Sequence, residues 1–325
     1  MKILLTHTPH MRDNYYGARA LAGLRALGEV VLHQGAETLE GAALIEAARG
    51  CDLMVADRAT AVPAQIFQGL PALKAVLRCA VDIRNIDVAA AASQGILVTR
   101  AKPGFVESVT ELVIGFLVDL NRHVSAATAA YRAGTPPVAR MGRQLAGTTI
   151  GIMGYGAIGR AVAPLAHAMG MQVLIADPFV TVAEPAFRQV DLPTLLAQSD
   201  HVVCLVVANE DTENLMNADA FGRMRRDAVF VNVSRGNLVD EAALAAALTE
   251  GRIAGAALDV GRAADQMPQP ALAALPNVIA TPHIGGLTPP AIEAQALHTV
   301  EQVRALAAGL VPEGAANADD WARRI

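Results

Sequence analysis

The fold is decided by residues 148–177, which begin Thr148-Thr149-Ile150-Gly151-Ile152-Met153-Gly154-Tyr155-Gly156-Ala157-Ile158-Gly159 and end Gln172-Val173-Leu174-Ile175-Ala176-Asp177. This pattern predicts a strand, a glycine-rich turn, a helix over 157–169, a second strand and an acidic residue. Gly154, Gly156 and Gly159 have the spacing G-x-G-x-x-G. In that spacing the first glycine permits a tight turn, the second lets the backbone approach a pyrophosphate, and the third lets the helix pack closely on the strand.

The residues after the turn indicate which dinucleotide it binds. The N-terminus of the following helix points free N–H groups and the positive end of its dipole at phosphates. Asp177 lies 18 residues after Gly159 and ends the second strand, where its carboxylate can accept hydrogen bonds from an adenosine ribose. No Arg or Lys follows until Arg188, so a 2′-phosphate would meet a negative charge without a nearby cation. The pattern favours NAD over NADP, and the alternative is a structural turn followed by a surface aspartate.

Length and composition argue against several other classes of protein. The chain has 325 residues, enough for two domains, and its net charge of −5, with no basic block, makes nucleic acid an unexpected partner. It is 53% hydrophobic, yet no apolar run reaches the roughly 18 residues of a membrane span. Residues 1–7 are too short for a signal peptide and predict a first strand. Three scattered cysteines predict neither a disulfide framework nor a metal cluster, and they suit a reducing cytoplasm: Cys51, Cys79 and Cys204.

The first hundred residues alternate short apolar strands with helices, which predicts a parallel sheet wrapped by helices. The expected strands are 2–6, 29–32, 53–56, 74–77 and 97–99. No phosphate-type glycine turn occurs in this part. A proline-free segment follows at 105–133 and predicts one long helix of the kind that bridges two domains.

A second α/β unit is predicted from residue 148 to about residue 284. Its later strands are expected at 201–207, 228–233, 254–260 and 278–280. Ligands of open α/β sheets bind beyond the carboxyl ends of the strands. Three of these ends carry functional groups: Ser234 and Arg235 after the second of the four, Asp259 at the end of the third, and His283 after the fourth.

Taken together, these stretches resemble the D-2-hydroxyacid dehydrogenase family of NAD-dependent enzymes, of which this chain looks like an atypical member. The resemblance covers nearly the whole chain and is most specific in the glycine turn, in 233–241 (Val-Ser-Arg-Gly-Asn-Leu-Val-Asp-Glu) and in 281–283 (Thr-Pro-His). It implies an α/β protein with two Rossmann-like or flavodoxin-like parallel-sheet domains. The substrate domain would be discontinuous, formed by 1–100 and 288–325, and 101–287 would form the NAD-binding domain. A homodimer joined through the NAD domains is also implied.

The resemblance further implies roles for individual residues. Arg235 would clamp the substrate carboxylate and polarise its 2-oxo group, a planar bidentate task for which Lys is poorly suited. His283 would be the general acid in reduction and the general base in oxidation. Asp259 would hold the nicotinamide carboxamide. The full set of implied cofactor contacts is Gly154, Tyr155, Gly156, Ala157, Ile158, Gly159, Asp177, Val207, Thr212, Val233, Ser234, Arg235, Asp259, His283 and Gly285.

The chain departs from the family pattern at the partner of the catalytic histidine. The family places a glutamate five residues after the position of Asp259, where it hydrogen-bonds the histidine. Here that position is Ala264, which has no side-chain acceptor. Asp265 is adjacent and could take over as a catalytic residue if the loop is shifted. Without a carboxylate partner, His283 should be a weaker acid catalyst at neutral pH.

A second departure lies in the implied substrate loop, where Ala80, Val81 and Asp82 align with a family segment whose backbone N–H groups bind the carboxylate. Glycines of the family are replaced by Ala80 and Asp82, and a usual aspartate is replaced by Arg84. Asp82 would bring a negative charge to the place where an anion docks. Either Arg84 neutralises it, or the loop has another shape, or the substrate is not a simple 2-oxo acid. A solvated surface pair of Asp82 and Arg84 is the plainer alternative.

The sequence therefore predicts an NAD-dependent oxidoreductase that transfers a hydride between nicotinamide and a small 2-hydroxy or 2-oxo acid. Two alternatives remain. Bound NAD could serve a non-standard reaction such as an elimination, a possibility raised by the missing glutamate. The chain could also be an NAD-sensing regulatory or interaction protein with weak catalysis. The expected partner is a small organic acid, with neither nucleic acid nor a membrane involved.

Overall fold

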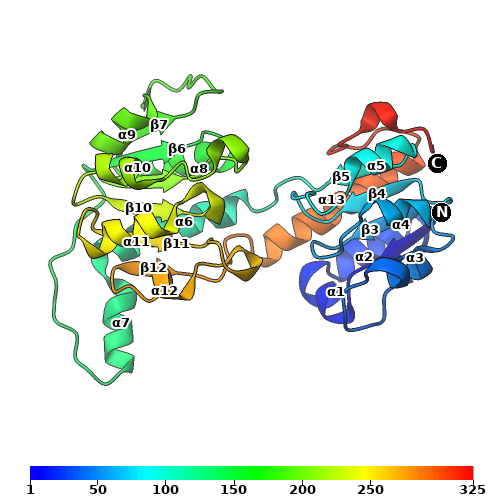
Figure 1. Cartoon of the computed structure of the whole chain (residues 1–325), viewed down its shortest axis with the longest axis horizontal. Helices are drawn as coiled ribbons and strands as arrows, with labels where there is room; N and C mark the ends of the chain where they lie inside the picture. The colour runs from blue at the N-terminus through cyan, green and yellow to red at the C-terminus, as the bar shows by residue number, and fades with distance from the viewer. Residues whose placement is uncertain (325) are drawn as a thin grey trace. The chain divides into compact units, whose positions relative to one another are not determined.

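The structure is a computed structural model of the chain, and it describes residues 1–324. The chain divides into two compact units (Figure 1). Unit 1 combines Met1–Phe105 with the chain from Thr288 onward, and unit 2 is Val106–Leu287. Both units are built on parallel sheets, which confirms the predicted α/β fold class with two parallel-sheet domains.

Unit 1 contains a five-stranded parallel sheet in the order β2-β1-β3-β4-β5. Its strands are β1 (Lys2–Leu5), β2 (Glu29–Leu32), β3 (Leu53–Ala56), β4 (Ala75–Arg78) and β5 (Leu97–Arg100). Its helices are α1 (Pro9–Tyr15), α2 (Ala18–Arg25), α3 (Gly41–Ala48), α4 (Ala64–Gln68), α5 (Val88–Ser93) and α13 (Pro289–Ala307), with the short turn η4 (Ala318–Asp320).

Strands β1, β3 and β4 of unit 1 are apolar except for Lys2 and Arg78 at their ends, because both faces of the sheet are covered. Successive residues point to opposite faces, so Leu4 and Met54 join the core on one side while Leu5 and Val55 join the core on the other. The second core also contains the inner side of α13, and the Tyr16 hydroxyl lies 2.8 Å from that of Thr299. The C-terminal helix is therefore an integral layer of unit 1.

Unit 2 contains a seven-stranded parallel sheet in the order β12-β11-β10-β9-β6-β7-β8. Its strands are β6 (Thr149–Met153), β7 (Gln172–Ala176), β8 (Phe187–Gln189), β9 (His201–Cys204), β10 (Val229–Asn232), β11 (Gly255–Leu258) and β12 (Val278–Ala280). Its helices are α6 (Val106–Arg122), α7 (Val124–Arg132), α8 (Ala157–Ala168), α9 (Leu192–Gln198), α10 (Ala218–Arg223), α11 (Glu241–Thr249) and α12 (Pro270–Ala273), with the short turns η1 (Glu210–Thr212), η2 (Gly236–Leu238) and η3 (Ala264–Gln266).

The order of the strands in unit 2 reverses at β6. The chain first builds outward through β7 and β8, then returns to β9 on the other side of β6 and continues to β12. Such a reversal opens a crevice at the carboxyl ends of the two strands where it occurs. The glycine turn follows β6 directly, so it lies at this crevice.

Two elements differ from the sequence-based expectation. The predicted long helix at 105–133 is two helices, because His123 adopts a left-handed φ of 56° between α6 and α7. Asp119 stabilises the break by accepting a 2.8 Å hydrogen bond from the amide of Ser125 through its carboxylate. Both helices belong to unit 2, so neither bridges the units. The edge strand β8 was not predicted. Within the described residues, no helix is long and apolar enough to cross a membrane.

Candidate active site at the carboxyl edge of the seven-stranded sheet

The glycine turn after β6 has the geometry that its spacing predicts. Gly154 has a φ of 91°, a region open to glycine, and a Cβ there would lie 2.8 Å from the carbonyl oxygen of Leu205. A Cβ on Gly159 would lie 2.4 Å from the carbonyl oxygen of Gly154. The first and third glycines therefore serve the tight turn and the close contact between α8 and β6.

Gly156 differs from the other two glycines because a Cβ there would meet no atom within 4 Å. The space over its backbone is open, at the N-terminus of the twelve-residue helix α8. Ala157 is exposed next to it, and Ile158 is half-buried. An exposed backbone at a helix N-terminus fits the pyrophosphate of a dinucleotide, which needs N–H donors and close approach.

Asp177 lies at the end of β7 beside the glycine turn. Its carboxylate accepts hydrogen bonds from the backbone amides of Tyr155 at 2.7 Å and Phe179 at 2.9 Å. The first of these bonds joins the aspartate directly to the turn. The Tyr155 side chain is buried under the Arg160 guanidinium, 4.5 Å from the centre of its ring, so Tyr155 presents backbone rather than its phenol to a ligand.

The segment after β9 forms a compact turn that contains two of the sequence-predicted contacts. The Thr212 hydroxyl donates a 3.0 Å hydrogen bond to the carbonyl of Val207, and its amide donates to the Asn209 carboxamide at 3.0 Å. The side chain of Val207 is 78% exposed. The turn therefore presents an apolar side chain beside the crevice, and the threonine hydroxyl fixes its shape.

Arg235 is held on a tight turn after β10. The Ser234 hydroxyl donates to the carbonyl of Val206 at 2.6 Å, and the Asn232 carboxamide donates to the carbonyl of Arg235 at 2.9 Å. The next residue, Gly236, packs directly on the backbone of Gly261, since a Cβ there would lie 2.1 Å from the Gly261 carbonyl carbon. Val233 is buried below the turn. The half-buried Arg235 is thus locked to the loop that follows β11.

Asp259, at the end of β11, holds the loop that carries His283. Its carboxylate accepts hydrogen bonds from the Thr281 hydroxyl at 2.6 Å and from the amides of Ile284 and Gly285, both at 2.8 Å. These donors lie on both sides of His283, and the aspartate is 2% exposed. The structure therefore gives Asp259 the task of fixing the histidine loop, in addition to any contact with a carboxamide.

His283 receives its hydrogen-bond partner from the backbone. Its Nδ1 lies 2.9 Å from the carbonyl oxygen of Asp265. A carbonyl only accepts, so Nδ1 carries the proton and Nε2 is left for exchange with a substrate. Asp265 thus reaches His283, as the sequence suggested, but it does so through its main chain instead of its carboxylate. His283 has a left-handed φ of 57°, and Asp265 one of 53°.

The substrate loop implied by the sequence lies at the carboxyl end of β4 in unit 1. Arg84 neutralises Asp82, with one guanidinium nitrogen 2.6 Å from the carboxylate. Ala80 and Asp82 have no positive φ, so their Cβ atoms are accommodated without strain. In the described part of the chain, the amides of Val81 and Ile83 have no hydrogen-bond acceptor. Burial raises the pKa of the neighbouring Cys79 thiol to about 12, which makes it unreactive.

The side chain of Arg78 supports this loop from below, and sequence reasoning missed it. Arg78 is 1% exposed and donates to the carbonyls of Thr60 at 3.1 Å and of Asp82 at 3.2 Å. It also donates to the carbonyl of Asp57, whose carboxylate binds the hydroxyls of Thr6 and Thr60. An arginine that ends a fully apolar strand is the signal that could have identified it.

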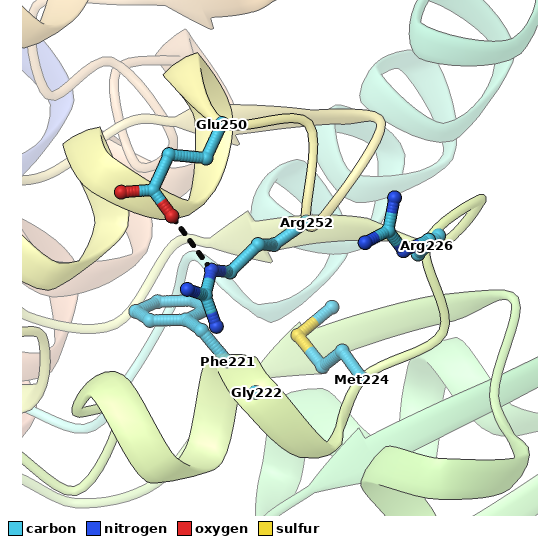
Figure 2. A pocket seen from close by; sticks show the side chains of 6 residues that line it. All are labelled: Phe221, Gly222, Met224, Arg226, Glu250 and Arg252. Carbon is cyan, nitrogen blue, oxygen red and sulfur yellow. Dashed lines mark hydrogen bonds and ion pairs between the residues drawn. The ribbon is translucent and has the colours of Figure 1, made fainter.

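Unit 2 has a hollow between α10 and α11 (Figure 2). Its lining residues are Phe221, Gly222, Met224, Arg226, Glu250 and Arg252. Arg226 precedes β10 and Arg252 precedes β11, so the hollow lies toward the amino ends of the strands. The glycine turn, Arg235 and His283 all follow the carboxyl ends. The hollow is therefore separate from the site described above.

A doubly wound parallel sheet with this glycine turn, and with an arginine and a histidine at its carboxyl edge, defines a dinucleotide-dependent dehydrogenase. The family model described as "D-isomer specific 2-hydroxyacid dehydrogenase, NAD binding domain" matches residues 114–285. The chain belongs to the D-isomer specific 2-hydroxyacid dehydrogenase family. This confirms the predicted family, the NAD cofactor and the oxidoreductase activity on 2-hydroxy acids.

Similar enzymes are named for different acids. The hydroxypyruvate reductase of Thermotoga maritima is 33% identical over 271 residues, which cover 82% of this chain and 88% of that protein. The (S)-sulfolactate dehydrogenase of Chromohalobacter salexigens is 35% identical over 268 residues, covering 81% and 87%. The crystal structure of the TT0316 protein from Thermus thermophilus has a TM-score of 0.86 at 31% identity, covering 97% of this chain and 100% of that one.

Proposed function

We propose that the chain reduces a small 2-oxo acid to the D-2-hydroxy acid, and catalyses the reverse oxidation, with Arg235 and His283 as its catalytic residues. NAD, when bound, supplies or accepts the hydride. The observation that carries this assignment is the 2.9 Å contact between Nδ1 of His283 and the carbonyl of Asp265, which calls for a proton on Nδ1. It leaves Nε2 as the nitrogen that gives a proton to the substrate oxygen in reduction and takes it back in oxidation.

Arg235 binds the carboxylate of the substrate and polarises its 2-oxo group. A guanidinium presents a planar fork that fits a carboxylate with two parallel hydrogen bonds. The turn that carries Arg235 is fixed by Ser234, Asn232 and the contact of Gly236 with Gly261. A fixed turn supports this role, because orientation of the reacting groups contributes strongly to rate.

The cofactor is held along the crevice between β6 and β9. The backbone at Gly156 and the N-terminus of α8 bind the pyrophosphate, and Asp177 accepts hydrogen bonds from the adenosine ribose. The exposed Val207 packs beside the cofactor on the turn that Thr212 fixes. Asp259 and Gly285 order the histidine loop against the nicotinamide end. The same negative charge of Asp177 disfavours a 2′-phosphate.

The loop of Ala80, Val81 and Asp82 supplies further substrate contacts within unit 1, and we assign that unit as the substrate domain. The amides of Val81 and Ile83, which have no acceptor among the described residues, are suited to bind an anion. Arg84 cancels the charge of Asp82, so the aspartate does not repel a carboxylate. The substrate class therefore remains a simple organic acid despite the departure from the family pattern.

The test is a screen of 2-oxo acids with NADH, in the wild type and in two variants. His283→Asn is preferred to Ala because asparagine tolerates the left-handed φ of 57° at this position. We expect His283→Asn and Arg235→Ala to lower kcat by about 100-fold or more while each still binds NADH. A fully active His283→Asn variant would overturn the assignment.

A second candidate function is a non-redox use of bound NAD, such as an elimination. It is favoured by one observation, namely that His283 has a neutral carbonyl as its partner, where a carboxylate would stabilise the protonated ring better. The two functions differ in their products, because an elimination converts substrate without net consumption of NADH.

We also propose that the chain forms a homodimer through α7. This helix has no buried residue, and Figure 1 shows it projecting from the rest of unit 2. Val124 is 52% exposed and Tyr131 is 70% exposed, seven residues apart on one helical face. An exposed apolar stripe of this kind marks an interface. Light scattering should give twice the chain mass, and Tyr131→Lys should reduce that mass to one chain; a wild-type monomer would refute the proposal.

Finally, we propose a cytoplasmic location. All three cysteines are buried free thiols, a state that a reducing compartment maintains. Cell fractionation that follows the protein by antibody would test this, and recovery from an oxidising compartment would contradict it.

A further inference from the structure

Arg262 makes four side-chain hydrogen bonds beside the proposed active site, and sequence reasoning gave it no role. Its guanidinium donates to the Glu213 carboxylate at 2.8 Å, to the Asn214 side-chain oxygen at 2.6 Å and to the carbonyl of Asn237 at 3.0 Å. It also donates to the carbonyl of Val239 at 3.1 Å. One planar cation therefore bonds to four acceptors.

These acceptors belong to loops that follow different strands. Glu213 directly follows the turn fixed by Thr212 after β9, and Asn237 lies two residues after Arg235 in the loop after β10. Arg262 itself belongs to the loop after β11. Glu213 and Asn237 are also bonded to each other at 2.9 Å. The guanidinium thus ties together the three loops that carry the cofactor turn, the substrate arginine and the partner of His283.

The segment 261–267, here called the Asp265 turn, is compact and strained. Its backbone is closed by a bond from the amide of Gly261 to the carbonyl of Gln266 at 2.7 Å. Asp265 and Gln266 have consecutive left-handed φ values of 53° and 58°. Non-glycine residues stay in this region only where their surroundings enforce it, and such strain collects at functional sites. The bonds made by Arg262 provide that enforcement at the start of the turn.

The strained shape of the Asp265 turn sets the direction of the Asp265 carbonyl. With the turn in this shape, the Asp265 carbonyl accepts the Nδ1 proton of His283 at 2.9 Å. A relaxed turn would carry this carbonyl away from the ring, and the neutral histidine would then distribute its proton between both nitrogens. Arg262, which bonds to the loops beside the Asp265 turn, therefore affects His283 without contacting it.

We propose that Arg262 is a positioning residue, which holds the Asp265 turn so that a backbone carbonyl orients His283 where Ala264 offers no side-chain acceptor. The proposal rests on the function assigned above. A lysine cannot replace the arginine, because one ammonium nitrogen cannot serve both the acceptors bonded to Nη2, in the loops after β9 and β10, and the Val239 carbonyl bonded to Nε.

The test compares Arg262→Gln and Arg262→Lys with a matched control, Arg252→Gln. Arg252 also makes a 2.8 Å ion pair, with Glu250, but at the opposite edge of the sheet. We expect both Arg262 variants to lower kcat for 2-oxo acid reduction by about tenfold, since small displacements of a catalytic group are costly. The control should keep the wild-type kcat.

A second readout does not depend on activity. Nitrogen NMR of histidine-labelled protein reports which ring nitrogen carries the proton, and the His283→Asn variant identifies the signal. In the wild type we expect the Nδ1–H form of His283, and in Arg262→Gln a mixture of both forms. A variant with lower thermal stability but unchanged kcat and unchanged tautomer would show that Arg262 is only a structural brace. Failure of the proposed function would appear separately, as an active His283→Asn variant.

Discussion

The Nδ1–H group of His283 donates a 2.9 Å hydrogen bond to the backbone carbonyl of Asp265. This contact separates two tasks that a side-chain carboxylate would perform together. The carbonyl fixes the tautomer and the orientation of the ring, as a carboxylate would. It carries no net charge, so it stabilises the protonated ring less than a carboxylate would. The chain therefore retains the geometry of an acid–base histidine and gives up part of the electrostatic support.

The first prediction concerns the Asp265 side chain. Asp265→Asn keeps the backbone carbonyl, and asparagine tolerates the left-handed φ of 53°. We expect kcat to stay within about twofold of the wild-type value, the effect of an ordinary surface substitution. Steady-state kinetics of 2-oxo acid reduction provide the measurement. A loss of 100-fold would mean that the carboxylate is the true partner of the histidine.

A second prediction restores the missing charge. Ala264→Glu places a carboxylate on the exposed residue next to Asp265, at the position where the family has its glutamate. Because an anion stabilises the protonated imidazole, the pH at which reductase activity falls to half should rise by about one unit. The matched control is Ala264→Gln, which has nearly the same size and no charge. An identical shift in both variants would rule out electrostatics as the cause.

The glycine turn gives a third prediction from two substitutions that differ in position alone. Gly156→Ala adds a Cβ in open space, so stability should be unchanged while the Kd for NADH rises by about tenfold or more, a loss of about 1.4 kcal/mol. Gly159→Ala adds a Cβ 2.4 Å from the Gly154 carbonyl oxygen and should lower the free energy of unfolding by about 1–3 kcal/mol. Fluorescence titration and thermal unfolding distinguish them. Equal NADH affinity in wild type and Gly156→Ala would place the pyrophosphate elsewhere.

A fourth prediction follows from a buried histidine. Burial, assisted by the charge of Arg143, lowers the pKa of His201 from 6.5 to about 4. Between pH 4 and pH 6.5 the unfolded chain therefore binds more protons than the folded protein. The contribution of neutral His201 to the free energy of unfolding is complete above pH 6.5 and is lost as the pH falls toward 4. At pH 5 the free energy of unfolding is lower by about 2 kcal/mol for this reason.

Urea unfolding of wild type and His201→Gln at pH 7 and pH 5 checks this sign. The difference in unfolding free energy between the two proteins should shrink by about 2 kcal/mol at the lower pH. The exposed His10 provides the control, because His10→Gln should give curves parallel to those of the wild type. A constant difference for His201→Gln would show that folding does not lower the pKa of this histidine.

The parts of the fold that local sequence determines were predictable. The apolar runs of β2, β3 and β12 begin and end where the pattern places them. In β3 all four residues are buried, which leaves little freedom in composition. The glycine spacing likewise predicted the turn between β6 and α8. Strand β8, in contrast, reads Phe187-Arg188-Gln189 and is largely exposed at the edge of the sheet, so it gives no apolar signal.

Features of the site that depend on distant residues could not be predicted. Every residue has a carbonyl, so the sequence does not distinguish the one at Asp265 that meets His283 from 18 positions away. The same holds for Arg262, whose partner Glu213 is 49 positions away. The break at His123 is set by a left-handed backbone that no proline or glycine announces. The residue types at the site were visible in the sequence, but the backbone that orients them was not.

The most direct measurement of the central claim is the transfer of deuterium. A 2-oxo acid that gives activity in the screen is incubated with NADH that carries deuterium at both positions of its reactive carbon. The product is analysed by mass spectrometry and chiral chromatography. The assignment predicts a D-2-hydroxy acid with one deuterium at C2, formed in equal amount to the NADH consumed, and almost none from His283→Asn. Product without deuterium, or formed without consumption of NADH, would contradict it.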